Sequence, residues 1–119
     1  MNAVFWREYR ECFNSIAQDK YCRAVVVSAA GRFFSVGLDI KDPDVLPSAD
    51  DKDVARKFMY MRDHVAIMQD TFTAMERCPQ PVIIAVQGAA IGGAIDLLCA
   101  ADIRLCTEKA FFCIKEVVS

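Results

Sequence analysis

The sequence predicts an α/β fold in which helices are layered against a largely parallel sheet. Three short runs (24–28, 82–86 and 103–106) are rich in Val, Ile and Leu and lack polar alternation, which is typical of strands buried on both faces. Helical apolar spacing over 54–77 and 92–101 separates the runs. Alternation of buried strands with helices is the pattern of a layered parallel sheet.

The segments before the second strand divide into a helix, a turn and two loops. Apolar side chains recur at helical spacing over Asn2–Asp19, and Asn2 is a residue type that caps helices. Residues 29–32 read as a turn, and Gly37 interrupts the apolar run 33–40, which favours a loop there. Two prolines and five aspartates over 41–53 predict a solvated loop rather than a metal site (Asp42, Asp44, Asp50, Asp51 and Asp53).

The long helical pattern over 54–77 ends before Pro79 and Pro81. His64 lies within it, and we expect this histidine at the surface or at the boundary of the core. We expect the methionines of this segment to pack in the core rather than to line a groove (59, 61, 68 and 75). Small residues over 88–93 predict a loop, and the apolar run 111–118 fits either a strand or a loop.

Length and composition restrict the class of protein. A chain of 119 residues corresponds to one domain or a piece of one, and its net charge of −2 argues against a nucleic-acid or polybasic membrane surface. No apolar run reaches the roughly 20 residues of a membrane span, and the first residues lack the pattern of a targeting signal. The six cysteines form no C-x-x-C pair, so we expect reduced, buried thiols and no metal site.

Two glycine-containing loops each follow a predicted strand. One is 35–39 after the first strand, and the other is 88–93 after the second, where Gly92 and Gly93 open an apolar helix that carries Asp96. Ligands bind at the carboxyl ends of the strands in open α/β sheets. Two loops at that edge can each point one backbone N–H at the same oxygen and form an oxyanion hole. Tight packing is the alternative role for such glycines, and neither nucleotide-binding glycine motif is present.

The segments FFSVGLDI, RCPQPVIIAVQGAAIGGAIDLLCAADIR and AFFCIKEV occur in this order. Together they resemble the enoyl-CoA hydratase/isomerase (crotonase) superfamily over nearly the whole chain. Asp rather than Glu at position 96, the FF-x-x-KEV segment and the first helix are most similar to its Δ3,5-Δ2,4-dienoyl-CoA isomerase branch. The resemblance implies that residues 1–119 form a partial domain, the N-terminal core portion of the spiral ββα fold shared by ClpP and crotonase.

The resemblance also implies roles for individual residues. Val36 and Gly93 match the positions whose N–H groups hold the thioester oxygen. The loop along the acyl-CoA matches four further residues (Ser35, Gly37, Leu38 and Asp39). Asp96 and Glu116 match catalytic carboxylate positions, and we expect Glu116, in an apolar setting, to transfer one proton while Asp96 polarises the substrate or assists. Without the resemblance, a solvated Glu116 and a helix-terminal Asp96 are the simpler interpretations.

The family implies acyl-CoA as the substrate, no separate cofactor because coenzyme A belongs to that substrate, and a homo-oligomeric trimer or hexamer. It also implies a mitochondrial or peroxisomal location. The family domain is about twice this length and has a further catalytic aspartate beyond the Glu116 position, so we expect weak or no activity from the chain as given. Two alternatives stay open: an enoyl-CoA hydratase, and an acyl-CoA-binding or oligomer-forming protein without catalysis.

Overall fold

The computed structural model describes residues 1–48 and 53–115. The helices and strands follow in chain order as α1 (Ala3–Gln18), β1 (Val25–Ser28), α2 (Val54–Glu76), β2 (Val82–Val86), β3 (Ala89–Ile91), α3 (Gly93–Cys99), β4 (Ile103–Cys106) and β5 (Phe111–Cys113). Glu116, Asp50 and Asp51 lie outside the described residues, so their predicted roles stay predictions.

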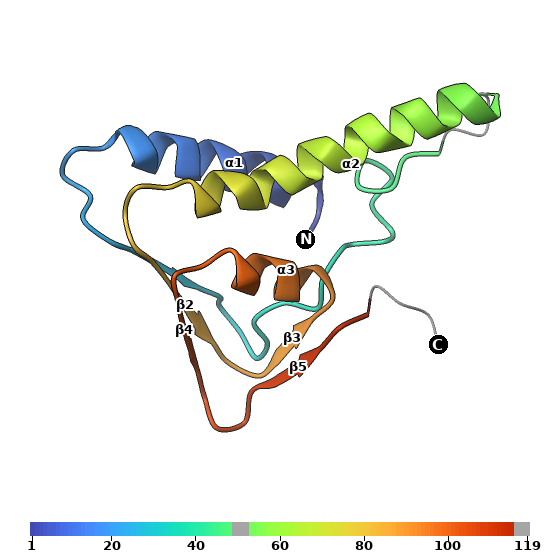
Figure 1. The fold of residues 1–119 in the computed structure, drawn as a ribbon. Coiled ribbons are helices and arrows are strands. Elements are labelled where there is room, and N and C mark those ends of the chain that lie inside the picture. The colour runs from blue at the N-terminus through green and yellow to red at the C-terminus, as the bar shows by residue number, and fades with distance from the viewer. Residues whose placement is uncertain (49–52, 116–119) are drawn as a thin grey trace.

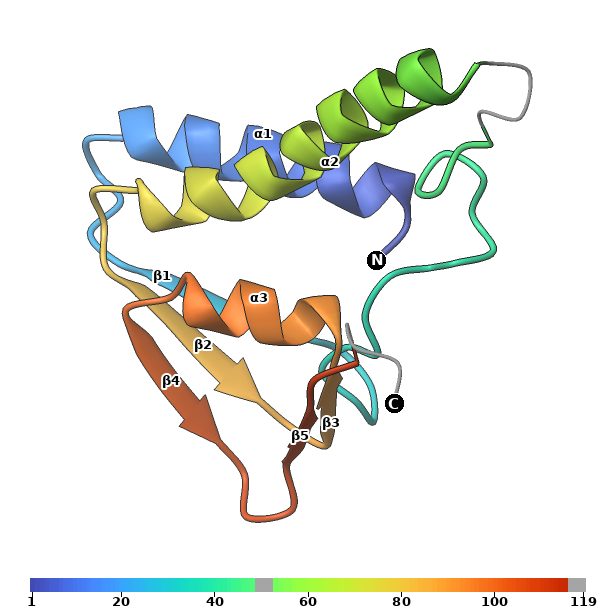
Figure 2. The same ribbon diagram turned by 45° about the vertical axis from the view of Figure 1, so that its right-hand side comes forward.

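The strands form two parallel sheets. β2 lies between β1 and β4 in a three-stranded sheet, and β3 pairs with β5 in a second sheet. α3 packs over β2, and α1 and α2 lie side by side in a further layer above α3 (Figures 1 and 2). The predicted α/β class and its parallel sheet are therefore confirmed.

Aromatic side chains hold α1 against α2. Asn2 caps α1 by accepting a hydrogen bond from the Phe5 N–H at 2.9 Å, as predicted. On the inner face of α1, Trp6 stacks against Phe72 of α2 with ring centroids 5.0 Å apart. The Tyr9 hydroxyl donates to the Met75 sulfur, and burial raises the pKa of Tyr9 above its ordinary value.

The hydrophobic core lies between the three-stranded sheet and the helices. Val82, Ile84 and Val86 point from β2 into this core, which also contains α3 residues that are at most 5% exposed (Ala94, Leu97 and Leu98). Burying an Ile side chain of this kind stabilises the fold by roughly 2–3 kcal/mol. Because β2 is the central strand, this face of the sheet fixes the position of α3 above it.

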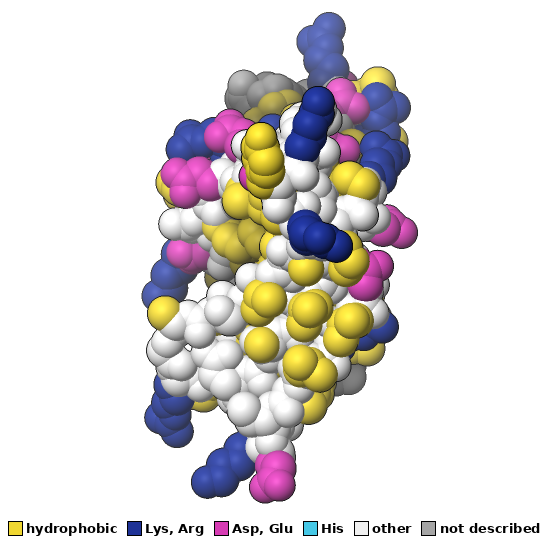
Figure 3. Space-filling model, turned by 90° about the vertical axis from the view of Figure 1, so that its left-hand side faces the viewer, with side chains coloured by type: hydrophobic (Ala, Val, Ile, Leu, Met, Phe, Trp, Pro, Cys, Tyr) yellow, Lys and Arg dark blue, Asp and Glu magenta, His cyan; other side chains and the backbone are white. Residues whose placement is uncertain are grey.

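The expectation that all three strands are buried on both faces is wrong for β1 and β4. Val26 is 65% exposed and Leu105 is 58% exposed, and all four residues of β4 are exposed. Figure 3 views the molecule from the left-hand side of Figure 1 and shows hydrophobic side chains gathered in the lower half of that view. The described helices cover only the opposite face of the sheet (Figure 1), so the apolar outer face lacks a covering layer among these residues.

Two elements differ from their predicted form. The 88–93 segment contains strand β3 rather than only a loop, because its small residues permit close pairing with β5. The predicted helix 92–101 is shorter, since α3 begins at Gly93 and ends at Cys99. The apolar run that begins at Phe111 is resolved as strand β5 up to Cys113.

The six cysteines are free thiols, but the expectation that they are buried is wrong: three are exposed and three are half-buried. Met75 is 1% exposed in the core as expected, whereas Met59 is 47% exposed. His64 is half-buried, as expected for a boundary residue. Among the described residues, no group of three His, Cys, Asp or Glu side chains is arranged to hold a metal ion, and none of the helices could cross a membrane.

Candidate active site

The fold brings the two predicted glycine loops into contact. Ser35 forms a parallel bridge with Ala90 of β3. Its N–H donates to the Ala89 carbonyl at 3.1 Å, and its own carbonyl accepts from the Ile91 N–H at 3.0 Å. Ser35, at the start of the 35–39 loop, therefore pairs with the edge of β3, and this pairing brings the loop close to the start of α3.

Gly37 shows how closely the two loops approach. Its φ is +90°, and a Cβ built on it would lie 2.9 Å from the Ile91 carbonyl oxygen and 3.4 Å from the Gly93 nitrogen. A side chain at this position would thus be strained in its backbone and would collide with the opposite loop. The Gly37 N–H also donates to the Ser35 hydroxyl oxygen at 3.2 Å, which closes a tight turn around Val36.

Gly93 supplies the second predicted donor because it is the first residue of α3. The N–H groups in the first turn of a helix have no partner within that helix. The turn is fixed by the N–H of Gly92, which donates to the Cys113 carbonyl at 2.9 Å, and by the Gly92 carbonyl, which accepts from Ile95 at 2.7 Å. Gly92 has a φ of +57°, which lets the chain pass from β3 into α3 within one residue.

The far side of the 35–39 loop is held by the start of the chain. The amino group of Met1 donates to the Gly37 carbonyl at 2.7 Å, and the Met1 carbonyl accepts from the Asp39 N–H at 2.9 Å. The sequence offers no signal for these contacts, since they use backbone groups whose partners depend on the tertiary fold. They fix Gly37 and Asp39 to Met1.

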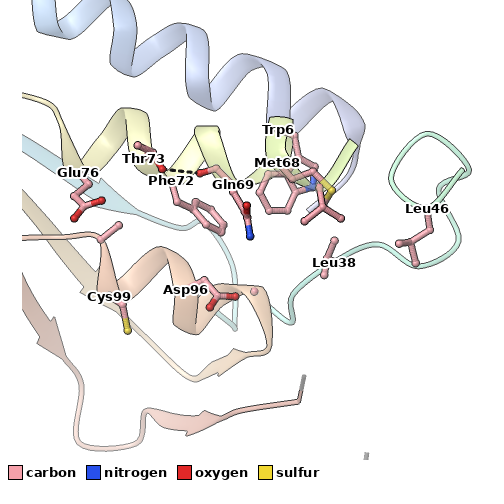
Figure 4. Close-up of a pocket in the computed structure, with 13 residues that line it drawn as sticks. Trp6, Leu38, Leu46, Met68, Gln69, Phe72, Thr73, Glu76, Asp96 and Cys99 are labelled. Atoms are coloured by element: carbon pink, nitrogen blue, oxygen red, sulfur yellow. Dashed lines mark hydrogen bonds between the residues drawn. The ribbon is translucent and has the colours of Figure 1, made fainter. Parts of the chain in front are cut away.

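A cavity of about 590 Å³ opens between α2, α3 and the 35–46 loop region. Asp96 lies on its wall in the first turn of α3 and is exposed to the cavity, with Gly93 beside it (Figure 4). Leu38 from the glycine loop lines the same space, and α2 contributes Met68 and Phe72. Met68 thus lines a groove, contrary to the expectation for that methionine.

The structure therefore assembles part of the predicted site. It brings Gly37 and Leu38 next to Gly93, and it places Asp96 in the adjoining cavity. Sequence reasoning missed Arg104, whose guanidinium donates to the carbonyls of Leu98 and Ala101 at 3.2 and 2.6 Å at the end of α3. A basic residue five positions after a short helix only weakly indicates a helix cap, because the strand that carries it decides where its side chain points.

The charge pattern of the assembled site suits an anion derived from a carbonyl group. The loop that carries the Val36 N–H adjoins the first turn of α3, which carries the Gly93 N–H, and the Asp96 carboxylate stands one helical turn from Gly93. Fixed donors of this kind stabilise negative charge on oxygen without reorganising. The carboxylate can exchange a proton with a neighbouring carbon acid. The arrangement is fit for proton transfer next to a polarised carbonyl.

Comparison with known proteins agrees with this chemistry. The sequence profile described as Enoyl-CoA hydratase/isomerase matches residues 1–118. The chain is 54% identical over 98% of its length to the human protein named mitochondrial Δ(3,5)-Δ(2,4)-dienoyl-CoA isomerase, of which it covers 36%. It is 38% identical over 95% of its length to the peroxisomal enzyme of that name from Arabidopsis thaliana, of which it covers 41%.

More distant relatives have a different name. A probable enoyl-CoA hydratase from Mycobacterium tuberculosis is 37% identical over 87% of the chain, which covers 35% of that protein. Among solved structures, an enoyl-CoA hydratase/carnithine racemase from Magnetospirillum magneticum superposes with a TM-score of 0.80 at 28% identity, over 100% of this chain and 43% of that one. The chain thus spans about a third of the length of the curated relatives cited here.

Proposed function

The chain belongs to the enoyl-CoA hydratase/isomerase family, and we propose that it carries the thioester-binding part of a Δ3,5-Δ2,4-dienoyl-CoA isomerase. The observation that supports this most directly is the contact between the 35–39 loop and the start of α3. A Cβ on Gly37 would lie 3.4 Å from the Gly93 nitrogen, so the loop that carries Val36 adjoins the start of α3. In this proposal, both N–H groups donate to the thioester oxygen of an acyl-CoA.

The reaction moves two double bonds into conjugation with the thioester. A proton leaves C2, the electron pair of that C–H bond forms the C2–C3 double bond, and the existing double bonds shift until C6 accepts a proton. The intermediate is a conjugated trienolate whose negative charge is shared between the thioester oxygen and the carbon chain up to C6. One preorganised donor at such an oxygen typically lowers the activation free energy by about 3 kcal/mol.

Asp96 and Glu116 are the proposed proton-transfer residues. Asp96 is on the first turn of α3, one turn from the Gly93 donor and exposed to the cavity. We propose that Glu116 transfers one of the two protons and that Asp96 polarises the substrate or assists the transfer. The reaction then needs no separate cofactor, because proton transfer and an oxyanion hole are sufficient for it.

Two findings favour isomerisation over hydration. The relatives named dienoyl-CoA isomerase reach 54% identity, whereas the probable hydratase reaches 37%. Asp96 is also one methylene shorter than a glutamate, which places its carboxylate closer to the helix backbone. Names of the relatives further support a mitochondrial or peroxisomal location and an acyl-CoA substrate, and we propose a homo-oligomer on the basis of the family alone.

The first test separates recognition of the thioester oxygen from general affinity for coenzyme A. Calorimetry compares octanoyl-CoA with its thioether analogue, which has a methylene in place of the carbonyl group. We expect the thioester to bind at least about tenfold more tightly, because a hydrogen bond left unmade in a buried site costs roughly 1–3 kcal/mol. Equal affinities would contradict the oxyanion-hole assignment.

The second test measures chemistry. The protein is mixed with a 3,5-dienoyl-CoA, and formation of the conjugated 2,4-dienoyl thioester is followed by its ultraviolet absorbance. Clear turnover would contradict the expectation of weak or no activity from residues 1–119. In that case Asp96→Asn and Glu116→Gln should each reduce it at least about a hundredfold, the usual effect of removing general acid–base catalysis. Asp70→Asn on the exposed side of α2 is the matched control and should leave turnover unchanged. Faster hydration of a 2-enoyl-CoA than isomerisation would favour the hydratase alternative.

A further inference from the structure

The candidate cavity has a polar end and an apolar end. Glu76 lies at one side and Asp96 near the middle, whereas Leu38 and Leu46 lie toward the other side, with Leu46 farthest from Glu76 (Figure 4). Trp6 of α1 and Met68 of α2 lie on the apolar side as well (Figure 4). A thioester held beside Gly93 would therefore extend its hydrocarbon tail toward Leu46, because burial of each methylene in an apolar wall is favourable.

Leu46 is held in place through its neighbour Val45. The Val45 side chain is 1% exposed and lines a second cavity of about 160 Å³, which is bounded by α1 and α2. The carbonyl oxygen of Val45 lies 2.8 Å from Nε2 of His64 on α2. Since a carbonyl only accepts hydrogen bonds, the proton resides on Nε2 and His64 is the donor.

A second set of hydrogen bonds anchors the same turn to α1. The N–H groups of Val45 and Leu46 donate to the Asp42 carbonyl at 3.1 and 3.3 Å. The Asp42 carboxylate accepts from the Ala3 N–H at 2.8 Å, at the start of α1. The turn that carries Leu46 is thus fixed to α1 through Asp42 and to α2 through His64, and only the His64 contact uses a side chain from the cavity-lining helix.

We propose that His64 is a positioning residue that limits the acyl chain length by holding Leu46 across the apolar end of the cavity. This inference rests on the proposed acyl-CoA function and adds the determinant of its specificity. While a tail fits between Gly93 and Leu46, each additional methylene should increase affinity about fourfold. Once the tail reaches Leu46, further methylenes remain in water and the affinity stops rising.

Two measurements test the anchor and its consequence separately. Amide hydrogen exchange reports whether the turn is held. In His64→Leu, the amide hydrogen of Leu46 should exchange at least tenfold faster than in the unmodified protein. His64→Gln retains a side-chain donor and should restore protection in part. Calorimetry with butanoyl-, octanoyl-, dodecanoyl- and hexadecanoyl-CoA then locates the length at which affinity stops rising. In His64→Leu this limit should move to a longer chain, whereas His64→Gln should stay close to the original limit.

Leu46→Ala is the variant that tests the wall without disturbing its anchor. It should also move the limit to longer chains, by roughly the three carbon atoms removed, while the affinity for butanoyl-CoA stays unchanged. Asp70→Asn on the exposed side of α2 serves as the matched control. If His64→Leu does not fold, Leu46→Ala still tests the wall: an unchanged limit in Leu46→Ala refutes the inference.

The outcomes distinguish this inference from the proposed function. If acyl-CoA binds but the limit is the same in His64→Leu, Leu46→Ala and the unmodified protein, the role of His64 and Leu46 is refuted while the proposed function stands. If the unmodified protein binds no acyl-CoA of any length, the proposed function fails and this inference fails with it. A limit that moves in both variants supports the inference whether or not the protein shows turnover.

Discussion

Replacing Gly37 by alanine tests whether the contact between the two loops builds the site. At a φ of +90°, an alanine is strained by about 1–2 kcal/mol. Its Cβ would also lie 2.9 Å from the Ile91 carbonyl oxygen, about 0.5 Å inside ordinary contact, so one loop must move. Movement that breaks one hydrogen bond between Ser35 and β3 adds about 1 kcal/mol. We therefore expect Gly37→Ala to destabilise the protein by about 2–3 kcal/mol.

Gly31→Ala is the matched control for this variant. Gly31 has nearly the same φ, +94°, but a Cβ there would meet no atom within 4 Å. The control therefore carries the backbone strain without the collision and should cost about 1–2 kcal/mol. Urea unfolding measures both variants, and Gly37→Ala alone should lose the preference for a thioester over a thioether. If the two variants are equally stable and bind equally well, the loop contact does not build the site.

The remaining predictions concern the pH dependence of stability and the core. Backbone hydrogen bonds from Ala3 and Asp44 lower the pKa of the Asp42 carboxyl group in the folded protein. The ionised carboxylate therefore stabilises the fold at neutral pH. This stabilisation is lost as the pH falls below about 4 and passes through the lowered pKa of the folded state. Asp42→Asn should flatten this part of the acid limb of a melting-temperature profile, and an unchanged profile would contradict the assignment. Ile84→Ala should lower the free energy of unfolding by about 2–5 kcal/mol because Ile84 is 0% exposed. Leu105 is 58% exposed, so Leu105→Ala should lower it by less than about 1 kcal/mol in the same chemical denaturation series. Similar losses in the two variants would show that the outer face of the sheet is covered in solution.

The sequence predicted the elements that follow from local pattern and missed those that depend on pairing. The predicted bounds of the strand 82–86 and the helix 54–77 agree with β2 and α2 to within one residue, since burial and helical spacing can be recognised from neighbouring residues of the sequence. β3 was missed because Ala89–Ile91 has the composition of a loop and becomes a strand only through β5 and Ser35. Burial of β4 was overestimated because apolar composition does not reveal whether a second layer covers the strand.

The same distinction applies to the candidate site. The glycine loops and Asp96 were identified from residue types, because positive φ and a carboxylate at a helix start leave a local signature. The contacts that position them left none: Met1 holds Gly37 through backbone atoms, and His64 reaches Val45 across 19 positions of sequence. A residue that acts by orienting another is recognised only when the tertiary structure shows what it touches.

The shortness of α3 explains why so many contacts converge on it. Seven residues from Gly93 to Cys99 form too few hydrogen bonds to be stable alone. β5 fixes its first turn through the Cys113 carbonyl and the Gly92 N–H, and β4 fixes its last turn through Arg104. The position of the Gly93 donor is therefore set by both sheets rather than by the helix itself. The N–H of Gly93, which we propose as an oxyanion donor, is thereby held in a fixed direction, and a fixed direction is the condition for preorganised stabilisation.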